Sequence, residues 1–175
     1  MDILWQILSY TIPSFFVLIV AYFTLKMVFQ NEEKRRRYEL FKANLSLITP
    51  VRLTAYERLV LFVERISPDS LMVRVQDSSL TSAQFHSFLL ATIRAEYEHN
   101  LSQQVYVSPE AWTFVKNAKE SMIQLINTSA SNVPPQVPSF ELAKVILDTY
   151  QNTSNETPTM FAINFLKSEI KQYFG

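Results

Sequence analysis

Apolar residues run from Ile3 to Leu25, about 23 positions, without a single charge. At a rise of ~1.5 Å per residue this stretch makes a helix of roughly 34 Å, enough to cross a hydrocarbon core of ~30 Å. A secretory signal peptide would begin with basic residues and have a shorter apolar core, whereas the first basic residue here is Lys26. The pattern therefore predicts a transmembrane helix that stays part of the protein.

Polar residues follow this stretch, but nothing in the sequence stops the helix there. Residues 29–48 contain neither Pro nor Gly and are rich in helix formers. We expect one helix from about residue 3 to about residue 47, kinked at Pro13, whose C-terminal part forms a stalk outside the membrane. Thr49-Pro50 is expected to end this helix, because the residue before a proline is pushed out of the α region.

After Pro50, apolar positions recur at helical spacing in segments separated by Pro, Ser and Asn. Thr81 and Gln84 have the spacing of a capping box, and Ser67 and Ser108 each precede a proline, as helix caps often do. The expected helices are residues 51–66, a short helix after Ser67 (for which a strand over 71–75 is the alternative), residues 81–101, a helix from Pro109 past Leu125, residues 140–150 and residues 160–173. The sequence SASNVPPQVPS predicts an exposed linker over 129–139.

Together these patterns predict an all-α protein in two parts. Residues 1–48 form one N-terminal transmembrane helix that continues into a stalk. Residues 49–175 form a compact cytoplasmic multi-helix domain, with the 129–139 linker inside it.

Basic residues occur only on the C-terminal side of the span, and they predict its orientation. They are Lys26, Lys34, Arg35, Arg36, Arg37 and Lys42. Because basic residues near the ends of a span stay in the cytoplasm, we expect a periplasmic N-terminus and a cytoplasmic C-terminal domain. Lys26 and the run from Lys34 to Arg37 are expected to contact anionic lipid headgroups. The alternative is that the run serves only as a stop-transfer signal.

Three residues in the outer half of the span form a candidate face for a membrane partner. Gln6, Ser9 and Pro13 are spaced i, i+3, i+7 and therefore share one side of the helix. Polar side chains within lipid favour contact with another helix. The alternative is that all three lie near the outer interface, where water reaches them.

Composition excludes several classes of function. The net charge is zero, which gives no argument for DNA or for an acidic substrate. The absence of Cys excludes thiol catalysis, disulfides, Fe–S clusters and cysteine zinc sites. The single glycine is Gly175, so the chain contains no P-loop, no dinucleotide fingerprint and no nucleophile elbow.

Glu96 and His99 have the Glu-x-x-His spacing that places two metal ligands on one helix face. A di-iron bundle needs a second such pair, but the other histidine, His86, has Ala83 three residues before it. A mononuclear site using Glu96, His99 and a distant carboxylate stays open, as does a Ser-His-Asp triad built on either histidine. The alternative is that Tyr97 faces the core while its polar neighbours cap or cross-link neighbouring elements. These neighbours are Glu96, Glu98, His99 and Asn100.

Two segments resemble a known group of proteins. The run AEYEHNLSQQVYVS (95–108), preceded by TAYERL (54–59), resembles a family of uncharacterised single-pass membrane-anchored proteins of Bacteroidetes. The resemblance extends from the anchor to about Ala130. It implies a bacterial inner membrane as the setting and no particular mechanism.

These observations favour a non-enzymatic accessory or adaptor subunit of a larger bacterial inner-membrane complex, without a cofactor. Its expected partners are an integral membrane protein complex, in which translocation, secretion and respiratory assemblies are not distinguished, and anionic lipid headgroups. One alternative is a membrane-tethered metal-dependent enzyme that uses Glu96 and His99. Another is a ribosome- or RNA-docking module that uses the basic run.

Overall fold

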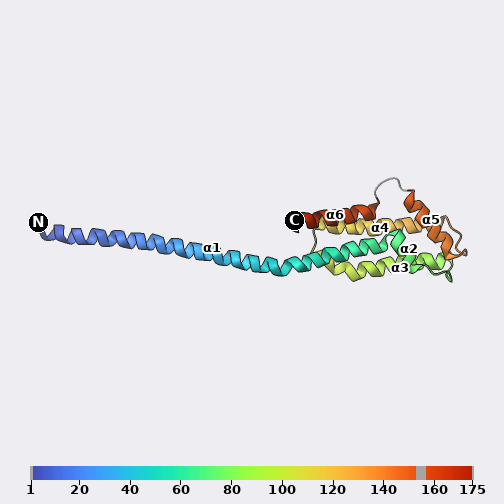
Figure 1. Cartoon of the computed structure of the whole chain (residues 1–175), viewed down its shortest axis with the longest axis horizontal. Coiled ribbons are helices and arrows are strands. Elements are labelled where there is room, and N and C mark those ends of the chain that lie inside the picture. Colours follow the sequence, from blue (N-terminus) through green and yellow to red (C-terminus); the bar gives the residue numbers. More distant parts are fainter. Residues whose placement is uncertain (1, 153–156, 175) are drawn as a thin grey trace. The chain divides into compact units, whose positions relative to one another are not determined.

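The helical spacing of apolar residues gives helices along almost the whole chain. The computed structural model describes residues 2–152 and 157–174, and it describes their side chains except at 2, 4–6, 8–14 and 174. Within these residues the only β-type pairing is an isolated bridge between Thr81 and Pro138. The elements are α1 (Asp2–Ile66), α2 (Pro68–Val75), α3 (Ser82–Asn100), the 3-10 helix η1 (Leu101–Val105), α4 (Pro109–Ser131), α5 (Ser139–Gln151) and α6 (Pro158–Phe174) (Figure 1). The predicted all-α fold is confirmed.

The chain divides into two units, Met1–Thr49 and Pro50–Gly175. In the first unit, all side chains described from Phe15 to Ile48 are exposed. Over the described residues, α1 is the one helix long and apolar enough to cross a membrane. The first unit therefore contains a candidate transmembrane helix, and the second contains the helical domain.

The helix break expected at Thr49-Pro50 is wrong, because α1 continues through both residues to Ile66. A proline inside a helix removes one hydrogen bond and costs about 3 kcal/mol or more. The next turns of the helix offset this cost, since Ala55, Tyr56 and Leu59 are fully buried. Burying each large side chain contributes about 1.5–3 kcal/mol, so tertiary packing outweighs the local preference.

The core of the second unit lies between the end of α1 and the helices α2 to α6. Its largest fully buried side chains repeat along each helix at the spacing of one face. They are Tyr56, Leu59, Phe62 and Ile66 from α1, Leu71 from α2, Phe85, Leu89 and Ile93 from α3, Ile126 from α4, Leu142 and Ile146 from α5, and Leu166 from α6. This core makes the second unit a domain with an interior of its own.

Two of the three predicted caps form as expected. Thr81 N donates to Gln84 Oε1 at 3.0 Å and Gln84 N donates to Thr81 Oγ1 at 3.3 Å, which completes the capping box. Ser108 accepts from Ala111 N at 3.0 Å. Ser67 stands at the N-cap of α2, but its hydroxyl donates to the carbonyl of Val63 in the preceding turn and does not cap.

The exposed linker predicted over 129–139 is wrong at both ends. Helix α4 extends to Ser131, and Ser129 and Ser139 are buried. The carbonyls of Pro135 and Val137 accept hydrogen bonds from the first backbone N–H groups of α3, at 3.1 and 2.8 Å. The first four N–H groups of a helix have no partners inside that helix. The segment supplies partners for such groups at the start of α3, and these hydrogen bonds hold it in place.

Candidate functional site

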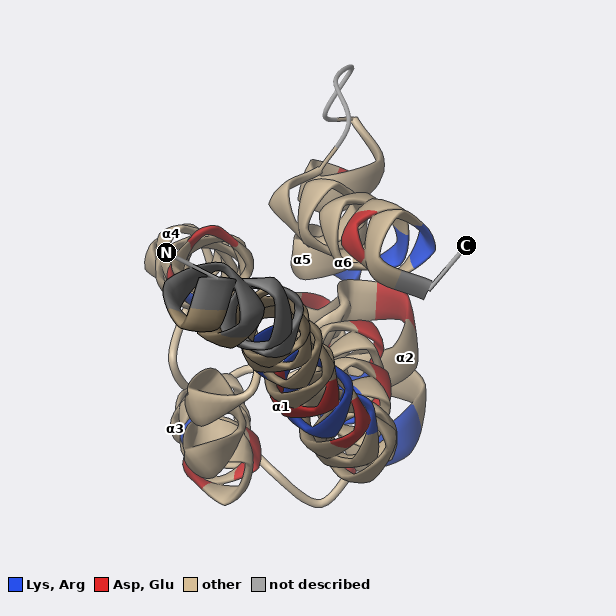
Figure 2. Ribbon diagram, turned by 90° about the vertical axis from the view of Figure 1, so that its left-hand side faces the viewer, with Lys and Arg blue, Asp and Glu red and all other residues tan. Residues whose placement is uncertain are grey.

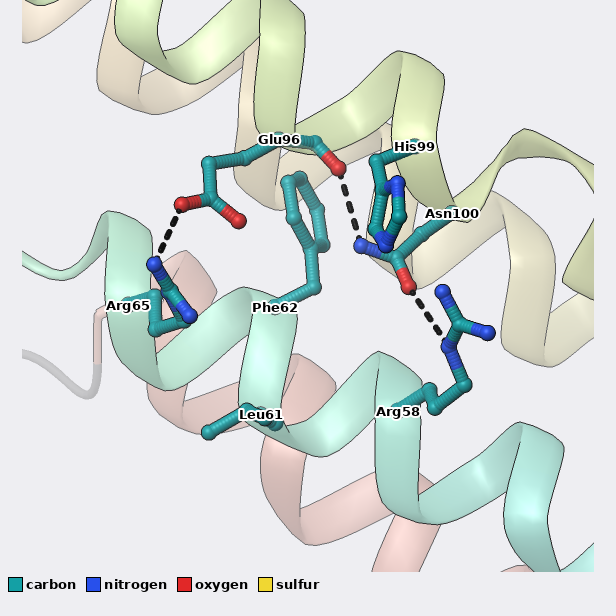
Figure 3. Close-up of a pocket in the computed structure, with 7 residues that line it drawn as sticks. All are labelled: Arg58, Leu61, Phe62, Arg65, Glu96, His99 and Asn100. Atoms are coloured by element: carbon teal, nitrogen blue, oxygen red, sulfur yellow. Dashed lines mark hydrogen bonds and ion pairs between the residues drawn. The ribbon is translucent and has the colours of Figure 1, made fainter.

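Aromatic packing fixes the rotation of α3 and turns one of its polar faces towards α1. The ring of Tyr97 lies between those of Phe62 and Trp112, with centroid distances of 5.9 and 5.5 Å. Glu96, three residues before His99 and four before Asn100, lies on the same side of the helix as both. Figure 3 shows these three residues facing Arg58 and Arg65 of α1 across a cleft.

Glu96 is the charged centre of this cleft. Its Oε1 lies 2.8 Å from Arg65 Nη2 and 2.9 Å from Arg74 Nη1, so one carboxylate oxygen joins α3 to both α1 and α2. Arg74 also donates to the backbone carbonyl of Arg65 at 3.1 Å. The Glu96 side chain is only 17 % exposed, and these ion pairs are therefore less screened than surface ones.

Asn100 extends the network along the cleft. It is 5 % exposed, its Nδ2 donates to the Glu96 carbonyl at 2.9 Å, and its Oδ1 accepts from Arg58 Nε at 3.3 Å. Both the nitrogen and the oxygen of this buried amide therefore have hydrogen-bond partners. Buried polar groups in proteins usually do, because leaving one without a partner costs free energy. The amide orients the Arg58 guanidinium towards α3 (Figure 3).

The cleft has a volume of about 300 Å³ and carries an excess of positive charge. Its lining residues are Arg58, Leu61, Phe62, Arg65, Glu96, His99 and Asn100. Arg65 Nε is buried without a hydrogen-bond partner among the described residues. The arrangement is suited to holding an anionic group, because arginine donors outnumber the acceptors that the cleft supplies.

The predicted pair Glu96 and His99 does share this cleft, but its surroundings do not favour a metal. Glu96 Oε1 is already bound by two guanidinium groups, whose positive charge repels a cation. Over the described residues, no group of three or more His, Asp or Glu side chains lies close enough together to hold a metal ion. The structure does not support a Ser-His-Asp triad at His86 either. Among the residues described, the His86 ring bonds the amide oxygen of Asn127 at 2.8 Å, and not a serine or an aspartate.

The residues predicted to contact lipid headgroups all lie on the exposed surface of α1. They are Lys26, Lys34, Arg35, Arg36 and Arg37. Arg35 pairs with Glu39 at 3.0 Å and Arg37 with Glu33 at 2.6 Å, so basic and acidic positions lie next to each other along this helix (Figure 2). Half of the basic run is therefore partly neutralised within the helix.

The candidate partner face of the span cannot be placed in the same way. Gln6, Ser9 and Pro13 belong to α1, which is uninterrupted at these positions. Their side chains lie outside the described ones. The face stays a prediction.

Sequence reasoning named Asn100 as a residue that caps or cross-links neighbouring elements, but it missed the three arginines in and beside the cleft, Arg58, Arg65 and Arg74. A usable signal was present for two of them: Arg58 and Arg65 are seven residues apart, with Phe62 between them, and thus lie on one side of a helix. Arg74 belongs to a different helix, and no local spacing connects it to Glu96.

A protein-family model described as "Family of unknown function (DUF7935)" matches residues 2–173. Among curated proteins and among solved structures, none matches the chain. The family match does not connect the chain with membrane-anchored proteins of Bacteroidetes, and that resemblance stays a prediction.

Proposed function

The chain belongs to the DUF7935 family of unknown function, and from its own residues we propose that it is a non-enzymatic accessory or adaptor subunit of a larger bacterial inner-membrane complex. Its N-terminal helix anchors it in the bilayer. Its second unit is an interaction domain that binds another protein on the cytoplasmic side.

One observation supports the role of the N-terminal helix as a membrane anchor. Every large apolar side chain described from Phe15 to Phe29 is between 38 and 68 % exposed. Soluble proteins rarely expose a continuous apolar surface of this size, whereas lipid tails cover it without cost. Lys26 and the basic run follow at the C-terminal end, which supports a cytoplasmic position for the domain and contact of these residues with anionic headgroups.

The second unit supports a binding role. The cleft holds arginines and no set of groups suited to metal or nucleophilic chemistry over the described residues. Large apolar side chains are exposed on several of its helices, among them Leu61 at 55 %, Val73 at 89 % and Phe140 at 57 %. Exposed apolar residues next to arginine are typical of protein interfaces. No observation favours the metal-dependent enzyme or the RNA-docking module over this role.

Copurification tests the proposal. The full chain, tagged at its C-terminus and extracted in mild detergent, is expected to bring down an integral membrane protein in fixed ratio. A control chain with residues 3–25 replaced by an unrelated apolar span separates partners held by the domain from partners held by the membrane face of Gln6, Ser9 and Pro13. A full chain that is monomeric and alone after extraction would contradict the proposal.

A further inference from the structure

We propose that the cleft between α1 and α3 is a carboxylate-binding site that takes an acidic side chain from a partner protein. This inference rests on the proposed adaptor function and names the chemistry by which the domain recognises its partner. Three features of the cleft support it: its excess of positive charge, its arginine N–H donors without partners in the described residues, and its apolar wall.

The charges in and beside the cleft do not balance. Two guanidinium groups, those of Arg65 and Arg74, pair with the single carboxylate of Glu96, and a third, that of Arg58, bonds only the neutral Asn100 over the residues that the structure describes. The other carboxylates of the same helix segments, on Glu57, Glu64 and Glu98, are exposed and do not line the cleft. An entering anion would therefore compensate charge that the domain leaves uncompensated.

Hydrogen-bond donors in the cleft are also incompletely used. Within the described residues, Arg58 makes one hydrogen bond, from Nε to Asn100 at a long 3.3 Å, and both of its terminal nitrogens are available. Arg65 pairs with Glu96 through Nη2, while its buried Nε has no partner in the described part of the chain. Because an unmade hydrogen bond at a buried donor costs free energy, an entering oxyanion that accepts from Arg65 Nε would supply a hydrogen bond that the domain lacks. The planar fork of arginine fits the two oxygens of a carboxylate.

The walls of the cleft favour a carboxylate on a protein over free phosphate. Leu61 stands 55 % exposed beside the arginines, and Phe62 forms an apolar floor. An ion that is polar on all sides gains nothing from these walls. An acidic side chain next to an apolar one uses both the arginines and these walls, and arginine is enriched among interface hot spots. The volume of about 300 Å³ accommodates side chains rather than a large cofactor.

The test follows the arginine Nε–H signals by NMR in the full chain, labelled with ¹⁵N-arginine and held in detergent micelles. The probe is a short peptide of alternating leucine and glutamate, and its glutamine counterpart is the neutral control. We expect the acidic peptide alone to shift the Arg58 and Arg65 signals saturably. Arg58→Gln should weaken binding at least tenfold, whereas Arg94→Gln, an exposed arginine of α3 outside the cleft, should leave it unchanged.

Three results would overturn the inference. The first is no shift with the acidic peptide. The second is an equal loss of binding in Arg58→Gln and Arg94→Gln, which would show general attraction to a basic surface. The third is an equal response to inorganic phosphate, which would assign the cleft to phosphate, free or on a lipid headgroup, and not to a protein segment.

The inference and the proposed function fail separately. If the Arg58→Gln chain copurifies with a partner as well as the unmodified chain does, the partner binds elsewhere, and the inference is wrong while the adaptor function stands. If the unmodified chain purifies alone but binds the acidic peptide, the adaptor function is wrong and the cleft remains an anion site.

Discussion

Replacing Glu96 with Gln tests whether this carboxylate joins three helices. The substitution keeps the size of the side chain and one acceptor oxygen, but it removes the charge that faces Arg65 and Arg74 at 2.8 and 2.9 Å. The side chains of the two arginines are 43 and 33 % exposed, and that of Glu96 is 17 % exposed. An exposed ion pair contributes about 0–1 kcal/mol, and breaking a buried one costs about 3–5 kcal/mol. We therefore expect the free energy of unfolding to fall by about 1–3 kcal/mol.

Denaturant unfolding of the full chain in micelles measures this change. Trp112 contacts Tyr97 in the domain and reports its unfolding by fluorescence in a Trp5→Phe background, which removes the other tryptophan. Glu98→Gln is the matched control, because it makes the same change at an exposed position two residues further along α3. The control should change the free energy of unfolding by less than about 0.5 kcal/mol. Equal stability of the Glu96 and Glu98 variants would refute the reasoning.

Three further predictions concern the domain. Thr81→Ala removes the hydroxyl of the capping box and should lower the free energy of unfolding by about 1 kcal/mol; an unchanged midpoint in denaturant would contradict the cap. Ile126→Ala, at a fully buried position of α4, should lower it by about 2–5 kcal/mol, whereas the exposed Thr128→Ala should not; equal effects would place Ile126 outside the core. Burial, together with the neighbouring Glu169 carboxylate, raises the pKa of Tyr56 above its usual 10.0, so the folded domain holds this proton more tightly and loses stability as the pH rises above that value. Thermal unfolding across alkaline pH should show a weaker loss for Tyr56→Phe, and an unchanged slope would exclude Tyr56 as its source.

Local chemistry made most helices predictable from the sequence. The capping box at Thr81 depends on residues three positions apart and the Ser-Pro start at Ser108 on adjacent ones, and the sequence shows both directly. The apolar spacing of α3 and α4 predicts a buried stripe, and Phe85, Leu89 and Val115 are buried, whereas Phe88 and Leu101 of the same spacing are exposed. These features need no knowledge of what lies beside the helix.

Features that depend on distant neighbours could not be predicted in this way. Proline at position 50 has a strong local preference against helix, but the packing of Tyr56 and Leu59 outweighs it. The Pro-rich segment after α4 looks like a linker, yet its carbonyls complete the start of α3.

In the cleft, too, local spacing was predictable from the sequence and contacts between distant residues were not. The spacing of Glu96 and His99 placed both on one face of a helix, as the structure has them. The arginines that decide the chemistry of this face come from α1 and α2, 31 and 22 residues earlier in the chain. Sequence spacing therefore left open a metal pair or a cross-link between elements, and the structure has the cross-link, made by ion pairs.

Protease accessibility in spheroplasts is the most direct test of the membrane anchor and its orientation. The account predicts that protease added to intact spheroplasts leaves residues 50–175 undigested, and that the same protease digests them once the membrane is opened. Digestion of the domain in intact spheroplasts, or a mature protein that lacks its first thirty residues, would contradict it.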